Sequence, residues 1–355
     1  MKAHFPEATD AWLLEKSPHS DVVVSSRARV ARNLQGIPFS PRASKEQLAA
    51  VTDALERALG ANGVFSDYLH YDLSALSKVD RRFLRESHLI SAEMEKGREH
   101  REVYLSPDGR TSIMVNEEDH VRLQTVAAGL QLNEVHARIE VTEAALEKGL
   151  KFAYHPQFGY LTACPTNTGT GLRVSVMVHL VGLAMTNQIE DSLGSLGDLG
   201  LVVRGAYGEH SSNAGDLFQI SNEVTLGKTE EQLIQSLEGV VHQIIGRETQ
   251  ARELLFRHAQ ARCEDQVQRA LGLLAHARMI DSNEAVTLLS RVRLAIGGDF
   301  GLRMTHEELN RLLIEVQPAH LRRRRDEIVS SEDGDRARAA MLRDRFSSPG
   351  NASRN

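Results

Sequence analysis

Four short segments combine charged side chains with turn-forming residues. The first, residues 25–33, reads Ser-Ser-Arg-Ala-Arg-Val-Ala-Arg-Asn, and in an extended backbone the alternation of side chains would place Arg27 and Arg29 on one side. Two guanidinium forks on one face suit an oligophosphate, because each planar fork can donate two parallel hydrogen bonds to phosphate oxygens. The alternative is an exposed edge strand with solvated arginines, which this segment alone would favour.

The second segment, residues 116–122, places three consecutive acids directly after the apolar run 113–115. Loops at strand ends often carry catalytic groups. Glu117, Glu118 and Asp119 would repel one another unless a cation, a metal ion or a guanidinium lies among them. The segment therefore indicates either a site for a positively charged group or a solvated acidic turn.

Two further segments join a strand to a turn of small residues. Residues 164–173 read Cys-Pro-Thr-Asn-Thr-Gly-Thr-Gly-Leu-Arg, which predicts a strand, a turn and a helix that begins near Leu172. A cysteine beside a helix N-terminus can be stabilised as a thiolate, whereas buried cysteines are usually inert. Residues 204–211 place Arg204 and Glu209 around two glycines, directly after the apolar run 201–203.

The sequence contains no standard nucleotide-binding loop. The run Gly227-Lys228-Thr229 resembles the end of a phosphate-binding loop, but Asn222 stands where that motif requires glycine. Residues 299–301 spell the magnesium motif of eukaryotic-type protein kinases, yet none of the other kinase motifs precedes them. Any nucleotide must therefore be held in another way.

Together the four segments resemble the phosphagen (guanidino) kinase family. The family's motifs Ser-Ser-Arg-x-Arg, Asn-Glu-Glu-Asp-His-x-Arg, Cys-Pro-Thr-Asn-x-Gly-Thr-Gly-x-Arg and Arg-Gly-x-x-Gly-Glu occur here in the family's order. The resemblance implies a phosphotransferase that holds ATP with a set of arginines. The residues that it implies in ATP binding are Ser25, Ser26, Arg27, Ala28, Arg29, His88, Arg122, Arg173, Val174, Ser175, Val176, Met177, Arg204, Gly205, Ala206, Tyr207, Gly208 and Glu209.

The resemblance also implies the catalytic groups. A guanidinium has a pKa of about 12.5 to 13.8, so it is a poor nucleophile until carboxylates hold it and accept a proton. Those carboxylates would be Glu118 and Glu209, and Cys164 would orient the guanidinium as a thiolate without forming a covalent intermediate. Mg²⁺ would accompany ATP, with Asp119 near its shell and no residue expected to bind the metal directly.

The parts of the chain outside these motifs indicate which molecule accepts the phosphoryl group. Family members that phosphorylate free arginine or creatine carry a helical domain before the Ser-Ser-Arg segment, and here only residues 1–24 precede it. Residues 277–280, 288–294 and 317–321 resemble the C-terminal domain of bacterial protein-arginine kinases of the McsB type. This resemblance implies arginine in proteins as the acceptor.

Two alternatives stay open for the function. The first is a kinase of free arginine or another small guanidino compound, which His210 after Glu209 favours. The second is a non-catalytic adaptor that binds phosphoarginine. The resemblance further implies a homodimer, an activator protein, and a role in the stress response and in Clp-dependent protein degradation.

The family's Arg-Asp-x-x-Arg-Ala motif forms a phosphoarginine pocket that is linked to allosteric activation. Its best match here is residues 334–339, with Asp335 and Arg338 in place and Gly334 instead of the first arginine. Loss of an arginine fork removes a charge-assisted hydrogen bond worth about 1.5 to 3 kcal/mol. We therefore expect the pocket to be weak, rearranged or absent.

Hydrophobic periodicity predicts the elements that position these segments. Helices are expected at 45–59, 133–150 and 333–346, and strands at 68–73, 103–106, 111–115, 160–163, 199–204 and 216–224. Thr229 and Gln232 predict a capping box for a long helix, after which the pattern is helical. We predict an α+β fold, an antiparallel sheet flanked by helices as in phosphagen kinases and glutamine synthetase, over residues 1–250. An all-helical domain follows over 251–355, with a disordered tail from about 347.

Composition and charge limit the classes of partner and the cellular compartment that we expect for this chain. The chain has 355 residues and a formal net charge of −6, so it lacks the general basic surface of a nucleic-acid binder, and we expect no nucleic-acid partner. No window approaches the roughly 18 consecutive apolar residues of a membrane span, so no membrane partner is expected. The only cysteines are Cys164 and Cys263, too few for a disulfide framework, which favours the cytoplasm.

Overall fold

The computed structural model describes residues 5, 11–205, 214–296, 300, 302–325 and 327–347. An eight-stranded sheet forms its centre, and every pair of neighbouring strands in that sheet is antiparallel. This confirms the predicted α+β class. The strands in sheet order are β2 (Leu69–Asp72), β3 (Glu102–Leu105), β4 (Thr111–Val115), β5 (Val121–Ala128), β1 (Val23–Arg32), β8 (Leu172–His179), β10 (Leu217–Asn222) and β9 (Leu201–Gly205).

Strand β1 lies in the middle of this sheet, between β5 and β8. The edge-strand alternative for residues 25–33 is therefore wrong. Along β1, half-buried Ser25, Arg27 and Arg29 alternate with fully buried Ser26 and Ala28. The alternation arises because successive side chains of a strand point to opposite faces.

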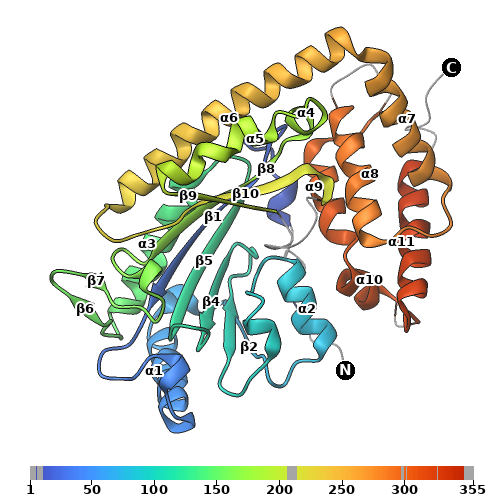
Figure 1. Cartoon of the computed structure of the whole chain (residues 1–355). Helices are drawn as coiled ribbons and strands as arrows, with labels where there is room; N and C mark the ends of the chain where they lie inside the picture. Colours follow the sequence, from blue (N-terminus) through green and yellow to red (C-terminus); the bar gives the residue numbers. More distant parts are fainter. Residues whose placement is uncertain are drawn as a thin grey trace.

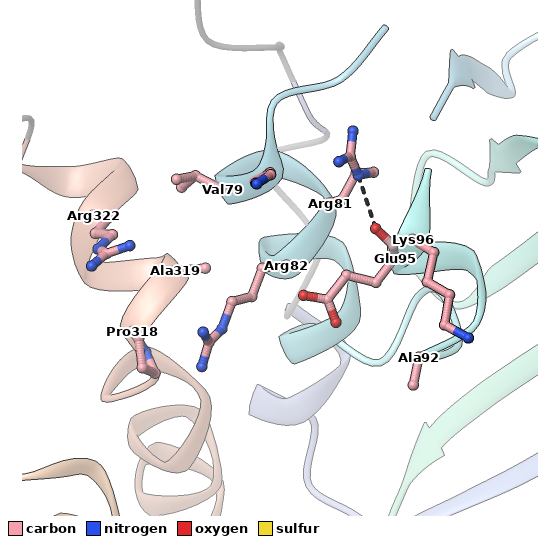
Figure 2. Close-up of a pocket in the computed structure, with 10 residues that line it drawn as sticks. Val79, Arg81, Arg82, Ala92, Glu95, Lys96, Pro318, Ala319 and Arg322 are labelled. Carbon is pink, nitrogen blue, oxygen red and sulfur yellow. Dashed lines mark hydrogen bonds between the residues drawn. The ribbon is translucent and has the colours of Figure 1, made fainter. Parts of the chain in front are cut away.

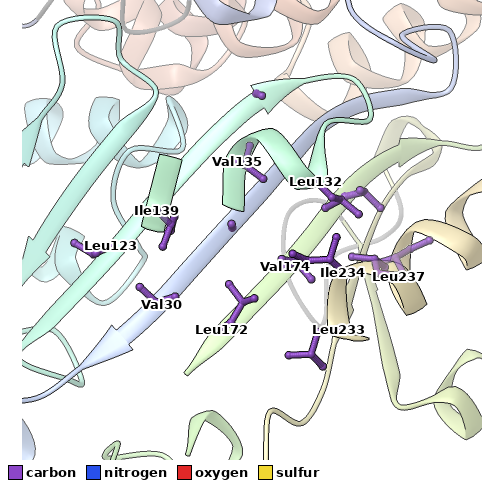
Figure 3. Close-up of a cluster of buried hydrophobic side chains, with 14 of the residues drawn as sticks. Val30, Leu123, Leu132, Val135, Ile139, Leu172, Val174, Leu233, Ile234 and Leu237 are labelled. Carbon is purple, nitrogen blue, oxygen red and sulfur yellow. The ribbon is translucent and has the colours of Figure 1, made fainter. Parts of the chain in front are cut away.

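The main hydrophobic core fills the space between one sheet face and the helices α1 (Lys45–Gly60), α3 (Leu132–Glu147) and α6 (Glu230–His258). Figure 3 shows side chains of α3 and α6 lying against those of β1, β5 and β8. The labelled members of this core are Val30, Leu123, Leu132, Val135, Ile139, Leu172, Val174, Leu233, Ile234 and Leu237. Capping boxes at Ser44 and Thr229 fix where α1 and α6 begin, the second of which the sequence predicts.

The remaining sheet-side elements are short. They are α2 (Lys78–Glu86), α4 (Val181–Met185), α5 (Ile189–Leu193) and the hairpin of β6 (Tyr154–His155) and β7 (Gly159–Tyr160). Two sequence predictions are wrong here. Residues 160–163 do not form a strand beyond Tyr160, and no helix begins near Leu172, because Leu172 opens strand β8, whose apolar residues pack in the core.

In the part of the chain that the structure describes, five helices follow α6 and form the C-terminal part. They are α7 (Gln260–His276), α8 (Ser282–Leu294), α9 (His306–Glu315), α10 (Pro318–Arg324) and α11 (Ser331–Phe346). A separate cluster of buried residues, including Leu274, Leu289 and Leu342, packs α7, α8, α9 and α11 together and reaches Val24 and Leu217 of the sheet. Leu321 of α10 packs against Ala337 of α11 in a smaller cluster. Figure 1 shows α6 crossing the sheet and the C-terminal helices gathered beside α2. Helix α6 continues without a break through residue 250, and no helix in the described ranges is both long and apolar enough to cross a membrane.

Candidate active site

Arg27, Arg29 and Arg173 lie on the sheet face opposite the main core. Arg29 is directly opposite Arg173 across β1 and β8, and Arg27 is opposite Ser175. Residues that face each other across antiparallel strands point to the same side of a sheet. The Arg27 guanidinium is held by the Gln219 side chain at 2.8 Å and by Ser175 Oγ at 3.4 Å.

Two further arginines share this face from neighbouring strands. Arg122 of β5 lies two residues before Gln124, the partner of Arg29 across β1 and β5. Arg204 of β9 is opposite Gln219 of β10. The sheet therefore brings together the five arginines that the sequence motifs identify, as a surface that we call the arginine face: Arg27, Arg29, Arg122, Arg173 and Arg204.

The arginine face concentrates positive charge with few counter-charges. Burial, together with repulsion from Arg122 and Arg173, lowers the pKa of Arg27 to about 10. Burial and then the charges of neighbouring arginines hold the pKa of Arg29 well below its ordinary value, and Arg29 Nε is buried without a hydrogen-bond partner among the described residues. A buried donor without an acceptor is costly, so an anion bound here would both accept from this donor and reduce the repulsion among the arginines.

A cavity of about 390 Å³ opens beside Arg27 and Arg29 of the arginine face, and its lining also includes the predicted Ser25, His88 and Met177. We call it the nucleotide cavity, because the sequence motifs predict that ATP binds there. Burial, followed by the charges of Arg27 and Arg85, lowers the pKa of His88 to about 4, so its ring is neutral at physiological pH.

Part of the lining was not expected from the sequence. Trp12 contributes from the N-terminal segment, and Asn310, Leu313 and Ile314 contribute from α9 of the C-terminal part. No local motif marks these residues, because they reach the cavity only through tertiary packing.

Four of the predicted ATP-binding residues point away from the cavity. Ser26, Ala28, Val174 and Val176 are the alternate residues of β1 and β8, and each is at most 1% exposed. Ser26 Oγ donates to the Gly129 carbonyl at 2.8 Å. Their side chains hold the sheet and its neighbouring turn together rather than face the nucleotide cavity.

Glu117 also lies at the site, although the sequence motifs predict no role for it. Its carboxylate forms an ion pair with Arg122. Burial alone would raise the pKa of Glu117, but attraction to Arg122, hydrogen bonds from Ser91 and Arg122, and the charge of Arg29 hold that pKa below its ordinary value. Ser91, which donates to Glu117, lines the nucleotide cavity. Glu117 is therefore a charged carboxylate that holds Arg122 close to this cavity.

Glu118 is exposed and lines a separate cavity of about 460 Å³. We call it the acceptor cavity, because the family resemblance predicts that Glu118 holds the acceptor guanidinium. Burial on one side, and then the like charges of Asp119 and Glu117, raise the pKa of Glu118 above its ordinary value. A raised pKa makes a carboxylate a better proton acceptor near neutral pH. Glu93, Glu99 and Glu117 also line this cavity, together with Arg98 and Arg101. These three glutamates are paired with Arg101, Lys45 and Arg122 respectively. Glu118 is thus the carboxylate of the lining that has no ion pair among the described residues.

Asp119 is 3% exposed and joins three segments. Its Oδ1 accepts from Asn33 Nδ2 at 2.6 Å and from the Ala163 amide at 2.7 Å. His120 completes this clamp, since its Nδ1 accepts from the Leu34 amide at 3.0 Å and its Nε2 lies 2.8 Å from the Pro38 carbonyl. The acidic loop is therefore tied to the loop that carries Cys164.

Cys164 is half-buried, and its Sγ lies 3.1 Å from Thr166 Oγ1. It precedes a three-residue 3₁₀ turn (Pro165–Asn167), not an α-helix, so the predicted stabilisation by a helix N-terminus is wrong. The nearby positive charge is Arg173, whose pKa is lowered by burial and by Arg204 and Arg122, and raised in part by Cys164.

The remaining predicted residues lie elsewhere. Arg338 is 2% exposed and donates to the carbonyls of Val316 and Ile280, each at 2.7 Å, and to Asp335 at 2.8 Å, so its guanidinium ties α11 to neighbouring helices. Gly205 ends strand β9 beside Arg204. Ala206, Tyr207, Gly208, Glu209 and His210 lie outside the described residues.

Comparisons with known proteins agree with this geometry. Residues 50–251 match the family model for the ATP:guanido phosphotransferase C-terminal catalytic domain, and residues 260–355 match that for the protein-arginine kinase McsB C-terminal domain. A protein-arginine kinase of Symbiobacterium thermophilum is 44% identical over 343 residues, which cover 96% of this chain and 97% of the relative. One of Shouchella clausii is 42% identical and covers 96% of this chain and 95% of the relative.

Two solved structures share the fold. Lombricine kinase has a TM-score of 0.58 at 27% identity and matches 70% of this chain and 72% of its own. The duplicated taurocyamine kinase of Schistosoma mansoni, with bound components of a transition-state analogue, has a TM-score of 0.59 at 27% identity and matches 68% and 36%. This chain therefore belongs to the ATP:guanido phosphotransferase family, among the members that carry the C-terminal domain of the protein-arginine kinases.

Proposed function

We propose that this protein is an ATP-dependent protein-arginine kinase, which transfers the γ-phosphoryl group of ATP to the guanidinium of arginine residues in proteins. The observation that carries the proposal is the arginine face, where Arg29 Nε is buried without a partner among the described residues and where like charges lower the pKa of Arg27 to about 10. The oxygens of a bound triphosphate would accept a hydrogen bond from Arg29 Nε and would reduce the repulsion among the arginines. Relatives named protein-arginine kinase that match 96% of this chain support arginine in proteins as the acceptor.

The arginine face would neutralise the phosphate oxygens and hold the γ-phosphoryl group in line with the acceptor. Arg122 would act on the side nearest the acceptor cavity, because its partner Glu117 lines that cavity. Arg27, held by Gln219 and Ser175, would act deeper in the nucleotide cavity.

Mg²⁺ is part of the proposal as the companion of ATP, where it would neutralise charge on the β- and γ-phosphates. No group of three or more His, Cys, Asp or Glu side chains in the described ranges could hold a metal ion by itself. Carboxylate oxygens are ligands that Mg²⁺ prefers, and Asp119 is the carboxylate that the acidic loop would offer to its water shell. Because Asp119 Oδ1 already accepts two hydrogen bonds, this aspartate fits an outer position.

Chemistry at the acceptor would begin with a guanidinium in the acidic acceptor cavity. Glu118, whose pKa is raised, would take a proton from the acceptor nitrogen as that nitrogen forms a bond to the γ-phosphorus. The bond from the γ-phosphorus to the bridging oxygen breaks, and ADP leaves. Cys164 and Glu209 would orient the acceptor from the opposite side, as the family resemblance implies.

The direct test incubates the full chain with ATP, Mg²⁺ and either an unfolded arginine-rich protein or free arginine. Phosphorus NMR and mass spectrometry at non-acidic pH should find phosphoarginine in the protein. Phosphorylation of free arginine alone would show a small-guanidine kinase instead. If neither is phosphorylated while phosphoarginine peptides bind, the protein is an adaptor.

Variants test the assigned groups. Loss of a general base costs about 10² to 10⁴ in rate, so Glu118→Gln should lower kcat within that range. Cys164→Ala should lower kcat as well, while the affinity for ATP is retained. Glu264→Gln, at an exposed position on α7, is the matched control and should leave turnover unchanged. Full activity of both active-site variants would show that the mechanism is wrong.

The biological setting in this proposal follows from the family resemblance. We include in it a homodimer, a cytoplasmic location, an activator protein, and a role in the stress response through Clp-dependent degradation of marked proteins. Phosphorylation removes the positive charge of an arginine and would change its contacts. Size-exclusion chromatography with light scattering tests the dimer directly.

A further inference from the structure

A third cavity, of about 460 Å³, lies between α2, the segment 92–96 and α10. Figure 2 shows Arg82 reaching from α2 toward α10, where Arg322 and Pro318 lie. Arg82 and Ala92 line both this cavity and the nucleotide cavity, so the two are neighbours. We call it the seam cavity, because it lies where the catalytic part meets the C-terminal helices.

Half of the lining residues of the seam cavity are basic. They are Lys78, Arg81, Arg82, Lys96 and Arg322. The only acid in the lining, Glu95, pairs with Arg85 outside it at 2.7 Å.

Two of the five basic groups are neutralised by carboxylates outside the lining. Arg82 pairs with Glu86 at 2.9 Å, and Lys96 pairs with Glu93. These pairs leave the positive charges of Lys78, Arg81 and Arg322 without a carboxylate in the part of the chain that the structure describes.

Arg81 is fixed in place without being neutralised. Its Nε donates to the Glu95 carbonyl at 2.9 Å, and its Nη1 donates to the carbonyls of Leu73 at 3.1 Å and Leu76 at 2.5 Å. It lies against Gly97, where φ is +60° and an added Cβ would come within 2.5 Å of the guanidinium. The absence of a side chain at Gly97 therefore leaves room for the half-buried guanidinium of Arg81 at this cavity.

The walls of the cavity are held together without any ligand. Glu86 accepts from the Ala319 amide at 2.9 Å, and Ser87 Oγ lies 3.2 Å from His320 Nε2. Arg323 forms an ion pair with buried Asp80. Because these contacts fix α10 against α2, the basic groups on both helices face a preformed space.

We propose that the seam cavity binds a phosphoryl dianion, with Lys78, Arg81 and Arg322 as its main counter-charges. Three uncompensated cations match a doubly charged group with three acceptor oxygens better than a singly charged carboxylate with two. The lining has no aromatic side chain on which a base could stack, so a second nucleotide is not the occupant. The phosphoryl group could be free phosphate or be attached to a side chain.

The site is independent of the proposed kinase activity, because Lys78, Arg81 and Arg322 do not line the nucleotide cavity. The test measures binding of inorganic phosphate to the full chain by calorimetry. A non-hydrolysable imido analogue of ATP, with Mg²⁺, is present at saturation so that phosphate cannot report on the arginine face.

The test variant is the double substitution Lys78→Ala/Arg322→Ala, which removes no hydrogen bond or ion pair among the described residues. Loss of a charge-assisted hydrogen bond is worth about tenfold or more in affinity, so the double variant should bind phosphate at least about tenfold more weakly. Lys148→Ala/Arg262→Ala removes two exposed charges elsewhere and should bind as the unaltered protein does. Circular dichroism checks that each variant is folded.

A second arm separates the two sources of the group. If a peptide carrying phosphoarginine displaces phosphate and its unphosphorylated form does not, the occupant is a phosphorylated side chain; if only phosphate binds, it is the free ion. Absence of phosphate binding, or equal affinity in both double variants, would overturn the proposal. Tighter binding of a polyglutamate peptide than of phosphate through the same two cations would replace the phosphoryl class and overturn it as well.

Discussion

The carboxylate of Asp119 accepts a 2.7 Å hydrogen bond from the amide of Ala163, and this bond joins the loop of Glu118 to the loop of Cys164. The same oxygen accepts from Asn33 Nδ2 at 2.6 Å, while Asn33 Oδ1 accepts from the His120 amide at 3.0 Å. The two proposed acceptor-site groups are therefore placed relative to each other through a buried residue.

This arrangement predicts that two substitutions at Asp119 differ. Asp119→Asn keeps an oxygen that accepts the same bonds, so kcat should fall by less than about tenfold. Asp119→Ala removes the acceptor and leaves two buried donors unpaired, and a small displacement of reacting groups can cost about 10²-fold in rate. Steady-state kinetics with ATP and a protein substrate measure both. Equal losses would show that the charge of Asp119, rather than its hydrogen bonds, is required.

The ion pair of Glu117 with Arg122 predicts a second effect. Glu117→Gln removes the counter-charge that holds Arg122 beside the nucleotide cavity. A charge-assisted hydrogen bond is worth about 1.5 to 3 kcal/mol, so kcat/KM for ATP should fall by about tenfold to a hundredfold.

The control for that variant is Glu99→Gln. Glu99 lines the same acceptor cavity but pairs with exposed Lys45 at 2.6 Å, and exposed pairs contribute little. Its kcat/KM for ATP should change by less than about twofold. If Glu117→Gln behaves like this control, then Arg122 is positioned by other contacts.

Sequence patterns predicted the structure correctly where residues close together in the chain determine it. Period-two alternation placed Arg27 and Arg29 on one face, and the Thr229 and Gln232 pair marked the start of α6. The predictions were wrong or incomplete where contacts with residues distant in the sequence determine the structure. Strand pairing made Leu172 the start of β8 instead of a helix, and packing brought Ile314 of α9 to the nucleotide cavity.

Trp12 provides a direct probe of the nucleotide cavity. It is the only tryptophan in the chain, is 2% exposed, and lines the cavity with an indole Nε1 that has no hydrogen-bond partner among the described residues. Binding of ATP or ADP should change the protein's tryptophan fluorescence in a saturable way. Trp12→Phe should abolish the signal and, by removing one donor, weaken nucleotide binding by about twofold to tenfold. Unchanged emission during active turnover would place the nucleotide elsewhere.

The seam between α2 and α10 predicts sensitivity to acid through His320, which is 5% exposed and lies 3.2 Å from Ser87. Burial, and then repulsion from Arg324 and other cations, lowers the pKa of His320 to about 3. An unfolded histidine titrates near about 6.5, so between these values the unfolded chain binds a proton that the folded chain does not. The folded state therefore loses stability as the pH falls through 6.5 and is unaffected well above it.

For one such histidine the loss between pH 7 and pH 5 is about 2 kcal/mol. His320→Gln removes this titration, so the difference between its free energies of unfolding at pH 7 and pH 5 should be smaller than that of the unaltered protein by about this amount. Urea unfolding at the two pH values measures it, with His276→Gln, at an exposed position on α7, as the matched control. An equal pH dependence for His320→Gln and the unaltered protein would show that His320 is already protonated in the folded seam. In that case its contact with Ser87 would be that of a charged donor.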